Sequence, residues 1–131
     1  MYMNKILVEV SVGELLDKIS ILEIKSEKIK DTEKLKYIKD EYDILKNQLS
    51  ENIKDYKEIQ SLYVSLKEIN SKLWVIEDDK RLCEKNSDFG DKFIKLSRDV
   101  HFLNDERARL KLEINNKTGS KIKEIKEYTK Y

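Results

Sequence analysis

Apolar residues recur every three or four positions through most of the chain, a spacing that predicts amphipathic helices. The first of these segments opens with Ser11 as N-cap and Glu14 three residues later, which together form a capping box. The chain contains no proline, the residue that breaks helices most strongly, which favours helix along the chain. Four helices are predicted, over residues 11–29, 32–52, 55–85 and 88–115.

The third and fourth helices are predicted to form an antiparallel hairpin, because only residues 86–88 separate them. Their apolar seams interlock where paired residue numbers sum to about 176, which places Leu73 beside Leu103. In this register Trp74 and Phe102 come level on an outward face. We expect the first two helices to cover that face.

The predicted fold is therefore all-α: one domain over residues 1–131, with an elongated antiparallel four-helix arrangement of two helical hairpins. The longest helices span roughly 40 Å at 1.5 Å per residue. Residues 6–10 are apolar and β-branched enough for a short strand, and residues 121–131 are compatible with a strand or a helical turn. The two ends would pair with each other, or the N-terminal strand with a second copy.

Composition excludes several classes of protein. The chain of 131 residues has 27 basic and 26 acidic groups, and its single cysteine forms neither an internal disulfide nor a multi-cysteine zinc site. With no signal peptide in view, this favours the cytoplasm. The longest mostly apolar stretch, residues 6–12, is far shorter than the roughly 20 residues of a membrane helix. Lysines alternate with acids along the helices, so nucleic-acid binding is not expected.

Arginine is rare here, and its positions are informative. Arg81, Arg98, Arg107 and Arg109 lie close together in the sequence of a lysine-rich chain, so each could be needed for the planar fork of arginine. That fork binds carboxylate or phosphate with two parallel hydrogen bonds. Chance clustering with ordinary salt bridges is the alternative.

Arg107 occupies a seam position, where an unpaired charge would be costly. We expect Asp17 or Glu14 as its carboxylate partner, with Asn70 and Asn104 as hydrogen-bonding neighbours. Three interpretations remain open: a buried ion pair that fixes helix register, an anion site within the bundle, or a side chain that reaches solvent.

The sequence gives little support for a catalytic or metal-binding site. Glu77, Asp78 and Asp79 are consecutive and point in different directions on a helix, so they do not share one ion. All-α nucleotide pyrophosphohydrolases pair two acidic motifs, whereas Glu14 and Asp17 here lack a second pair, which leaves magnesium only weakly supported. No catalytic residue, metal ligand or cofactor is predicted. The single histidine excludes a di-iron site, and Cys83 is expected in the core.

Several linked motifs together resemble one family of bacterial and phage proteins, catalogued as domain of unknown function 6165. They lie at residues 10–19, 73–78, 93–100, 104–107 and 119–120. The resemblance implies a compact all-helical protein of unassigned activity, in a family sometimes expected near surface-polysaccharide genes. It supplies no catalytic residue.

The sequence is compatible with two functions. The first is a non-enzymatic interaction module, either an adaptor or a protein that associates with itself, because amphipathic hairpins dominate a chain without a catalytic constellation. The alternative is a site for a small anion such as a nucleotide or nucleotide sugar, with phosphate-ester hydrolysis assisted by magnesium as its furthest extension. The candidate ligand residues for this alternative are Glu14, Asp17, Lys18, Trp74, Glu77, Asp78, Arg81, Arg98, Asn104, Asp105 and Arg107.

Overall fold

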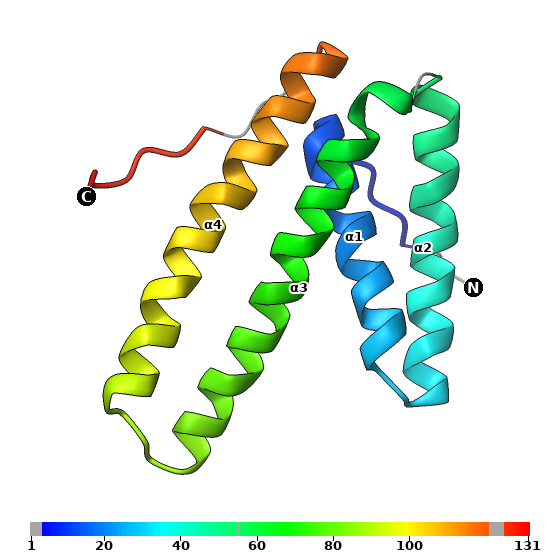
Figure 1. Cartoon of the computed structure of the whole chain (residues 1–131). Helices are drawn as coiled ribbons and strands as arrows, with labels where there is room; N and C mark the ends of the chain where they lie inside the picture. Colours follow the sequence, from blue (N-terminus) through cyan, green and yellow to red (C-terminus); the bar gives the residue numbers. More distant parts are fainter. Residues whose placement is uncertain (1–3, 55, 121–124) are drawn as a thin grey trace.

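The computed structural model describes residues 4–54, 56–120 and 125–131 and has four helices (Figure 1). They are α1 (Val12–Lys28), α2 (Thr32–Asn52), α3 (Lys57–Lys85) and α4 (Asp91–Thr118). The predicted all-α class and four-helix arrangement are confirmed. Residue 55, where the third helix was expected to start, lies outside the described residues, and α3 begins two residues later.

The helix ends follow from local hydrogen bonding. The Ser11 hydroxyl accepts a hydrogen bond from the Glu14 backbone N–H at 3.0 Å, as the capping-box pattern predicts. Asp31 caps α2 in the same way. The fourth helix ends three residues later than expected, where Gly119 adopts a left-handed φ of 68° that glycine tolerates best.

The helices form two antiparallel hairpins of unequal length. Figure 1 shows the two hairpins close together at the end where α1 begins and splayed apart toward the α3–α4 connection. Helix α1 packs against each of the other three helices, whereas the α2 backbone lies against α1 alone. The shape is elongated, and α1 is the element that joins the two hairpins.

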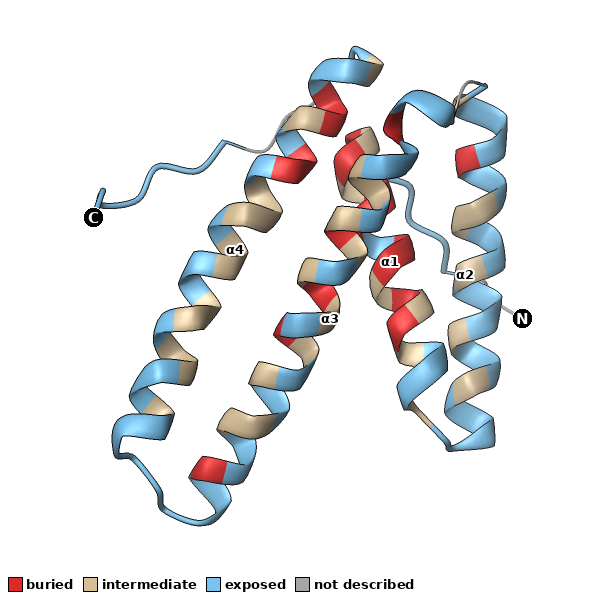
Figure 2. Cartoon of the chain, in the orientation of Figure 1, coloured by how far each residue is buried: buried red, intermediate tan, exposed pale blue. Residues whose placement is uncertain are grey.

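The hydrophobic core lies where α1 meets α3 and α4, and side chains from α2 complete it. Buried residues gather in this region in Figure 2, while the far half of the α3–α4 hairpin is mostly exposed or half-buried. Cys83 is an exception in that half and is buried, as expected of a core residue. The core cluster consists of Leu15, Leu16, Ile19, Leu49, Ile59, Leu66, Leu110 and Ile114.

The register of α3 against α4 agrees with the prediction, but one expected contact is wrong. Val75 and Ile76 share a groove with Phe102 and Leu103, as paired numbers near 176 require. Phe102, however, is 43% exposed and packs against the rings of His101 and Tyr131, so α1 and α2 do not cover it. Trp74 is half-buried. The register was right, whereas the placement of the second hairpin over Phe102 was not.

Both chain ends differ from their predictions. Residues 4–10 form no strand, and three of their apolar side chains, Ile6, Leu7 and Val8, are exposed. An isolated apolar run has no neighbouring edge with which to pair, so propensity alone was not sufficient. In the C-terminal tail, residues 121–124 lie outside the described part, and residues 125–131 are neither helix nor strand. Within the described residues, no helix has the length and apolarity needed to cross a bilayer.

Candidate functional site

A buried polar network joins α1 to the α3–α4 hairpin. The Arg107 guanidinium donates from Nε to Asp17 Oδ1 at 2.8 Å and from Nη2 to Asp17 Oδ2 at 2.6 Å. Asn70 Nδ2 donates to the same Oδ1 at 2.9 Å and to Ser20 Oγ at 2.8 Å. Asn104 accepts from Arg107 Nη1 at 3.4 Å. The predicted partner and both predicted amide neighbours of Arg107 therefore meet at one place.

The charges in this network hold each other in the ionised state. Burial alone would raise the pKa of the Asp17 carboxyl. Hydrogen bonds from Arg107 and Asn70, together with the positive charges of Arg107 and Lys111, outweigh burial and lower that pKa below its ordinary value of 3.8. Because both Asp17 oxygens already accept hydrogen bonds, the network is a closed ion pair.

A second set of contacts ties the start of α1 to the end of α4. Asn115 Oδ1 accepts from the Gly13 backbone N–H at 2.7 Å, and Lys111 Nζ pairs with Glu14 Oε2 at 2.7 Å. Gly13 lies directly against the Lys111 carbonyl, so there is no room for a side chain at this position. The approach of α1 to α4 therefore depends on glycine.

The other predicted ligand residues do not join this network. Lys18, Glu77, Asp78 and Arg81 are exposed, and Trp74 is half-buried on α3. Asp105 accepts a hydrogen bond from the Tyr131 hydroxyl. Within the described residues, no group of three or more His, Cys, Asp or Glu side chains is placed to hold a metal ion. The fold therefore brings Asp17, Asn104 and Arg107 into one network and pairs Glu14 with Lys111 instead of Arg107. The remaining candidates are spread over the surface.

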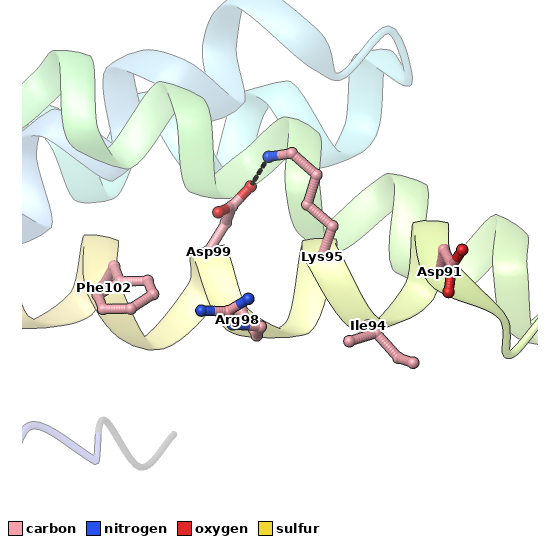
Figure 3. Close-up of a pocket in the computed structure, with 6 residues that line it drawn as sticks. All are labelled: Asp91, Ile94, Lys95, Arg98, Asp99 and Phe102. Atoms are coloured by element: carbon pink, nitrogen blue, oxygen red, sulfur yellow. Dashed lines mark hydrogen bonds and ion pairs between the residues drawn. The ribbon is translucent and has the colours of Figure 1, made fainter. Parts of the chain in front are cut away.

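Arg98 lies at a shallow cavity on the outer side of α4. The cavity has a volume of about 440 Å³, and Figure 3 shows Arg98 between Ile94 and Phe102, with Lys95 paired to Asp99 at 2.8 Å. Among the described residues, neither Arg98 nor Arg81 has an ion-pair partner, in contrast to Arg107 and Arg109. Of the four arginines, two are thus free to meet something outside the chain.

A larger groove runs between α3 and α4, and we call it the α3–α4 groove. Its volume is about 630 Å³. Val75 and Phe102 on its walls are 48% and 43% exposed. Contiguous exposed apolar surface of this kind is typical of a site of interaction. The lining residues are Ser71, Lys72, Val75, Ile76, Asp99, Phe102 and Leu103.

Sequence reasoning missed a cluster of tyrosines around one carboxylate. Tyr42, Tyr56 and Tyr63 come from α2, the α2–α3 connection and α3, and all three pack against the core. Burial, the charge of Glu23 and the neighbouring Tyr42 raise the pKa of Tyr56 to about 12. Glu23 Oε1 and the Tyr63 hydroxyl are buried without a hydrogen-bond partner. The sequence places Glu23 on the buried side of α1, but no motif marks the three tyrosines. The cluster could therefore not be predicted from the sequence.

The family comparison covers nearly the whole chain. A model described as a family of unknown function, DUF6165, matches residues 6–131. No curated protein and no solved structure gives a significant match. The match includes all four helices, the Asp17–Arg107 pair and the α3–α4 groove. The chain therefore belongs to the family of unknown function DUF6165.

Proposed function

We propose that this protein is a helical interaction module that binds an amphipathic helical surface of another polypeptide in the α3–α4 groove. The observation that carries the proposal is that α1 and α2 leave this apolar groove uncovered. In this function the α1–α2 hairpin stabilises the longer hairpin, and the α3–α4 groove of the longer hairpin binds the partner.

The closed state of the Asp17–Arg107 pair supports this function over ligand binding at that position. A guanidinium whose two donors already hold a carboxylate has to lose that pair before it binds a phosphate. The pair instead connects α1 to α4, as a register-fixing ion pair would. The α3–α4 groove is then the larger of the two described surface cavities that remain accessible to a partner.

A partner helix is the occupant that fits the chemistry of the groove. Its walls carry Val75, Ile76, Phe102 and Leu103, and Lys72 and Asp99 lie at its edges. Helices dock in such grooves through apolar side chains spaced three and four residues apart. Charges at the rim select the partner and its direction, and buried apolar side chains supply most of the affinity.

The test is site-specific photo-crosslinking in the cells that make the protein. Benzoylphenylalanine replaces Val75 in one variant and Ile44, an exposed residue of α2, in the control. We expect one defined polypeptide adduct from position 75, none from position 44, and loss of the adduct after Phe102→Glu. The polypeptide identified by mass spectrometry should then bind purified wild-type protein at least about tenfold more tightly than Phe102→Glu. Equal adducts from both positions would contradict the proposal.

One observation favours a second candidate function, the binding of a small phosphate-bearing ligand such as a nucleotide. Arg98 is exposed beside Phe102 and has no ion-pair partner among the described residues. Arginine and an aromatic ring together suit a phosphate and a base. A thermal-shift titration with nucleotides and nucleotide sugars, with and without magnesium, tests this function. Stabilisation lost in Arg98→Ala but kept in Arg81→Ala would support it, and no shift in the wild type would exclude it.

A further inference from the structure

We propose that the polypeptide bound in the α3–α4 groove is a second copy of this chain, so that two α3–α4 hairpins pack face to face as a four-helix bundle. In that bundle Val75 of each copy contacts Phe102 of the other. This inference rests on the proposed function, because it names the partner of the same surface. Three features of the described residues support it.

The first feature is that the two walls of the groove face away from α1. Asn70 on α3 and Arg107 on α4 both contact Asp17 of α1. Val75 and Phe102 each lie five residues from these positions, which is about 140° around a helix. The hairpin therefore presents one face to α1, and no other helix among the described residues covers its opposite face. Tyr131 of the C-terminal tail packs on Phe102 of this face and has to move aside when a second hairpin covers it.

The second feature is the size of the free face. Helices of 29 and 28 residues are each roughly 40 Å long, and two packed helices are about 20 Å wide with their side chains. The face therefore offers about 800 Å² per copy, which is the size of a standard stable interface. A short peptide would leave much of the apolar length uncovered, including Val64 and Leu82.

The third feature is charge complementarity beside the contact between Val75 and Phe102. If the two-fold axis runs parallel to the helices, each residue keeps its level, and α3 lies on α4 of the second copy. Lys72 then meets Glu106 of the second copy, and Glu68 meets Arg109 of the second copy. Glu106 and Arg109 are also paired with each other within one chain, so these contacts would extend an existing ion pair. Both pairs lie on the side of the Val75–Phe102 contact that is nearer the start of α3. On the other side, Asp78 meets Arg98 of the second copy, an opposite pair, and Asp79 meets Asp99 of the second copy, a like pair.

The alternative two-fold axis, perpendicular to the helices, brings together both like and opposite charges. It would pair α4 with α4 of the second copy around Phe102. Lys95 would then face Arg109 of the second copy, and Asp99 would face Asp105 of the second copy. Arg98 would face Glu106 of the second copy, and Lys72 would face Asp78 of the second copy, and both of these are opposite pairs. Under this axis residues 72 and 106 do not meet, so variants at these two positions distinguish the two arrangements.

The test is sedimentation equilibrium of the full-length protein with charge-reversed variants. We expect a dimer for the wild type and roughly tenfold weaker dimers for Lys72→Glu alone and for Glu106→Lys alone. An equimolar mixture of these two variants should recover wild-type association, since positions 72 and 106 then carry opposite charges at both contacts of the mixed dimer. Charge changes within one chain do not produce recovery on mixing. The matched control is Ile44→Glu on α2, which should dimerise as the wild type does.

The outcomes separate this inference from the proposed function. A wild-type protein that stays monomeric up to about 100 μM, with its helical circular dichroism intact, overturns the second copy as partner. If position 75 still crosslinks one other polypeptide, the proposed function survives with a different partner, and if it does not, both fail. A dimer that persists in Val75→Glu also overturns the arrangement. So does a mixture of Lys72→Glu and Glu106→Lys that does not recover wild-type association.

Discussion

Arg107 binds both carboxylate oxygens of Asp17 across 90 residues of sequence, from the last helix to the first. Asp17 is 2% exposed and the Arg107 side chain 28%, so the carboxylate is the deeply buried member. Loss of the arginine leaves a buried negative charge without its partner. The effect on stability should therefore exceed that of an ordinary surface salt bridge.

Arg107→Ala is expected to lower the free energy of unfolding by about 3 kcal/mol, at the lower end for a buried pair because Arg107 is partly exposed. Urea denaturation followed by circular dichroism measures this. Arg109→Ala is the matched control, because Arg109 pairs with Glu106 and Glu113 on the surface of the same helix. Its loss should be below about 1 kcal/mol. Equal losses for the two variants would show that the Asp17 pair has no special role.

The same pair makes stability depend on pH in the acid range. The pKa of Asp17 is lower in the folded protein than its ordinary value, so the carboxylate favours folding once ionised in both states. That contribution is fully present above about pH 4 and is lost as pH falls through the lowered pKa. Unfolding curves between about pH 2 and pH 6 should show this loss in the wild type and a shallower dependence in Asp17→Asn. An identical slope in the two proteins would contradict the prediction.

Gly13→Ala is expected to destabilise the protein by about 3 kcal/mol or more, since the new Cβ would overlap the Lys111 carbonyl. It would also lie 2.9 Å from Asn115 Oδ1, which accepts the Gly13 N–H. The control is Gly90→Ala, whose Cβ would meet only Asp88 Oδ1 at 3.6 Å. Because Gly90 is the N-cap of α4, where alanine is less favourable than glycine, the expected loss is about 1 kcal/mol or less. Thermal unfolding of the two variants compares them directly. A stable Gly13→Ala protein would mean that α1 can shift away from α4.

Tyr56 should ionise at a higher pH than a tyrosine of ordinary pKa. Its pKa is raised to about 12 by burial, by the charge of Glu23 and by Tyr42. Ultraviolet titration should therefore show one late phenolate component, which Tyr56→Phe removes. Because the folded pKa lies above that of the unfolded chain, the contribution of Tyr56 to stability is present below about pH 10 and is lost between about pH 10 and pH 12. A titration curve unchanged by Tyr56→Phe would contradict this.

Hydrophobic spacing was sufficient to predict the helices and their hairpins. The short connection after α3 fixes the α3–α4 register, and Arg107 in an apolar seam indicates a carboxylate partner. The helices and their register depend on local sequence, and the partner of Arg107 follows because an unpaired buried charge is strongly disfavoured. Both can therefore be predicted from the sequence. The candidate ligand residues were not gathered by the fold, because exposed charges on helices have no strong preference for one site.

The position of the second hairpin could not be derived in the same way. An amphipathic helix requires cover for its apolar face but does not specify which helix supplies it. Phe102 was expected beneath α1 and α2, whereas α1 lies on the other side, where Gly13 permits close approach. That choice depends on three-dimensional fit between Gly13, Lys111 and Asn115. A glycine followed by a charged residue in a helix start does not reveal such a fit.

The central position of α1 has a consequence for synthesis of the chain. Gly13 finds its amide partner 102 residues later, and Asp17 its guanidinium 90 residues later. During translation the first hairpin therefore leaves the ribosome with Asp17 still unneutralised, and it stays incomplete until almost the whole polypeptide has been made. A nascent chain that stops before Arg107 lacks the charge that would close its core. A chain truncated before Arg107 is therefore expected to be loosely folded and more open to proteolysis than the full-length protein.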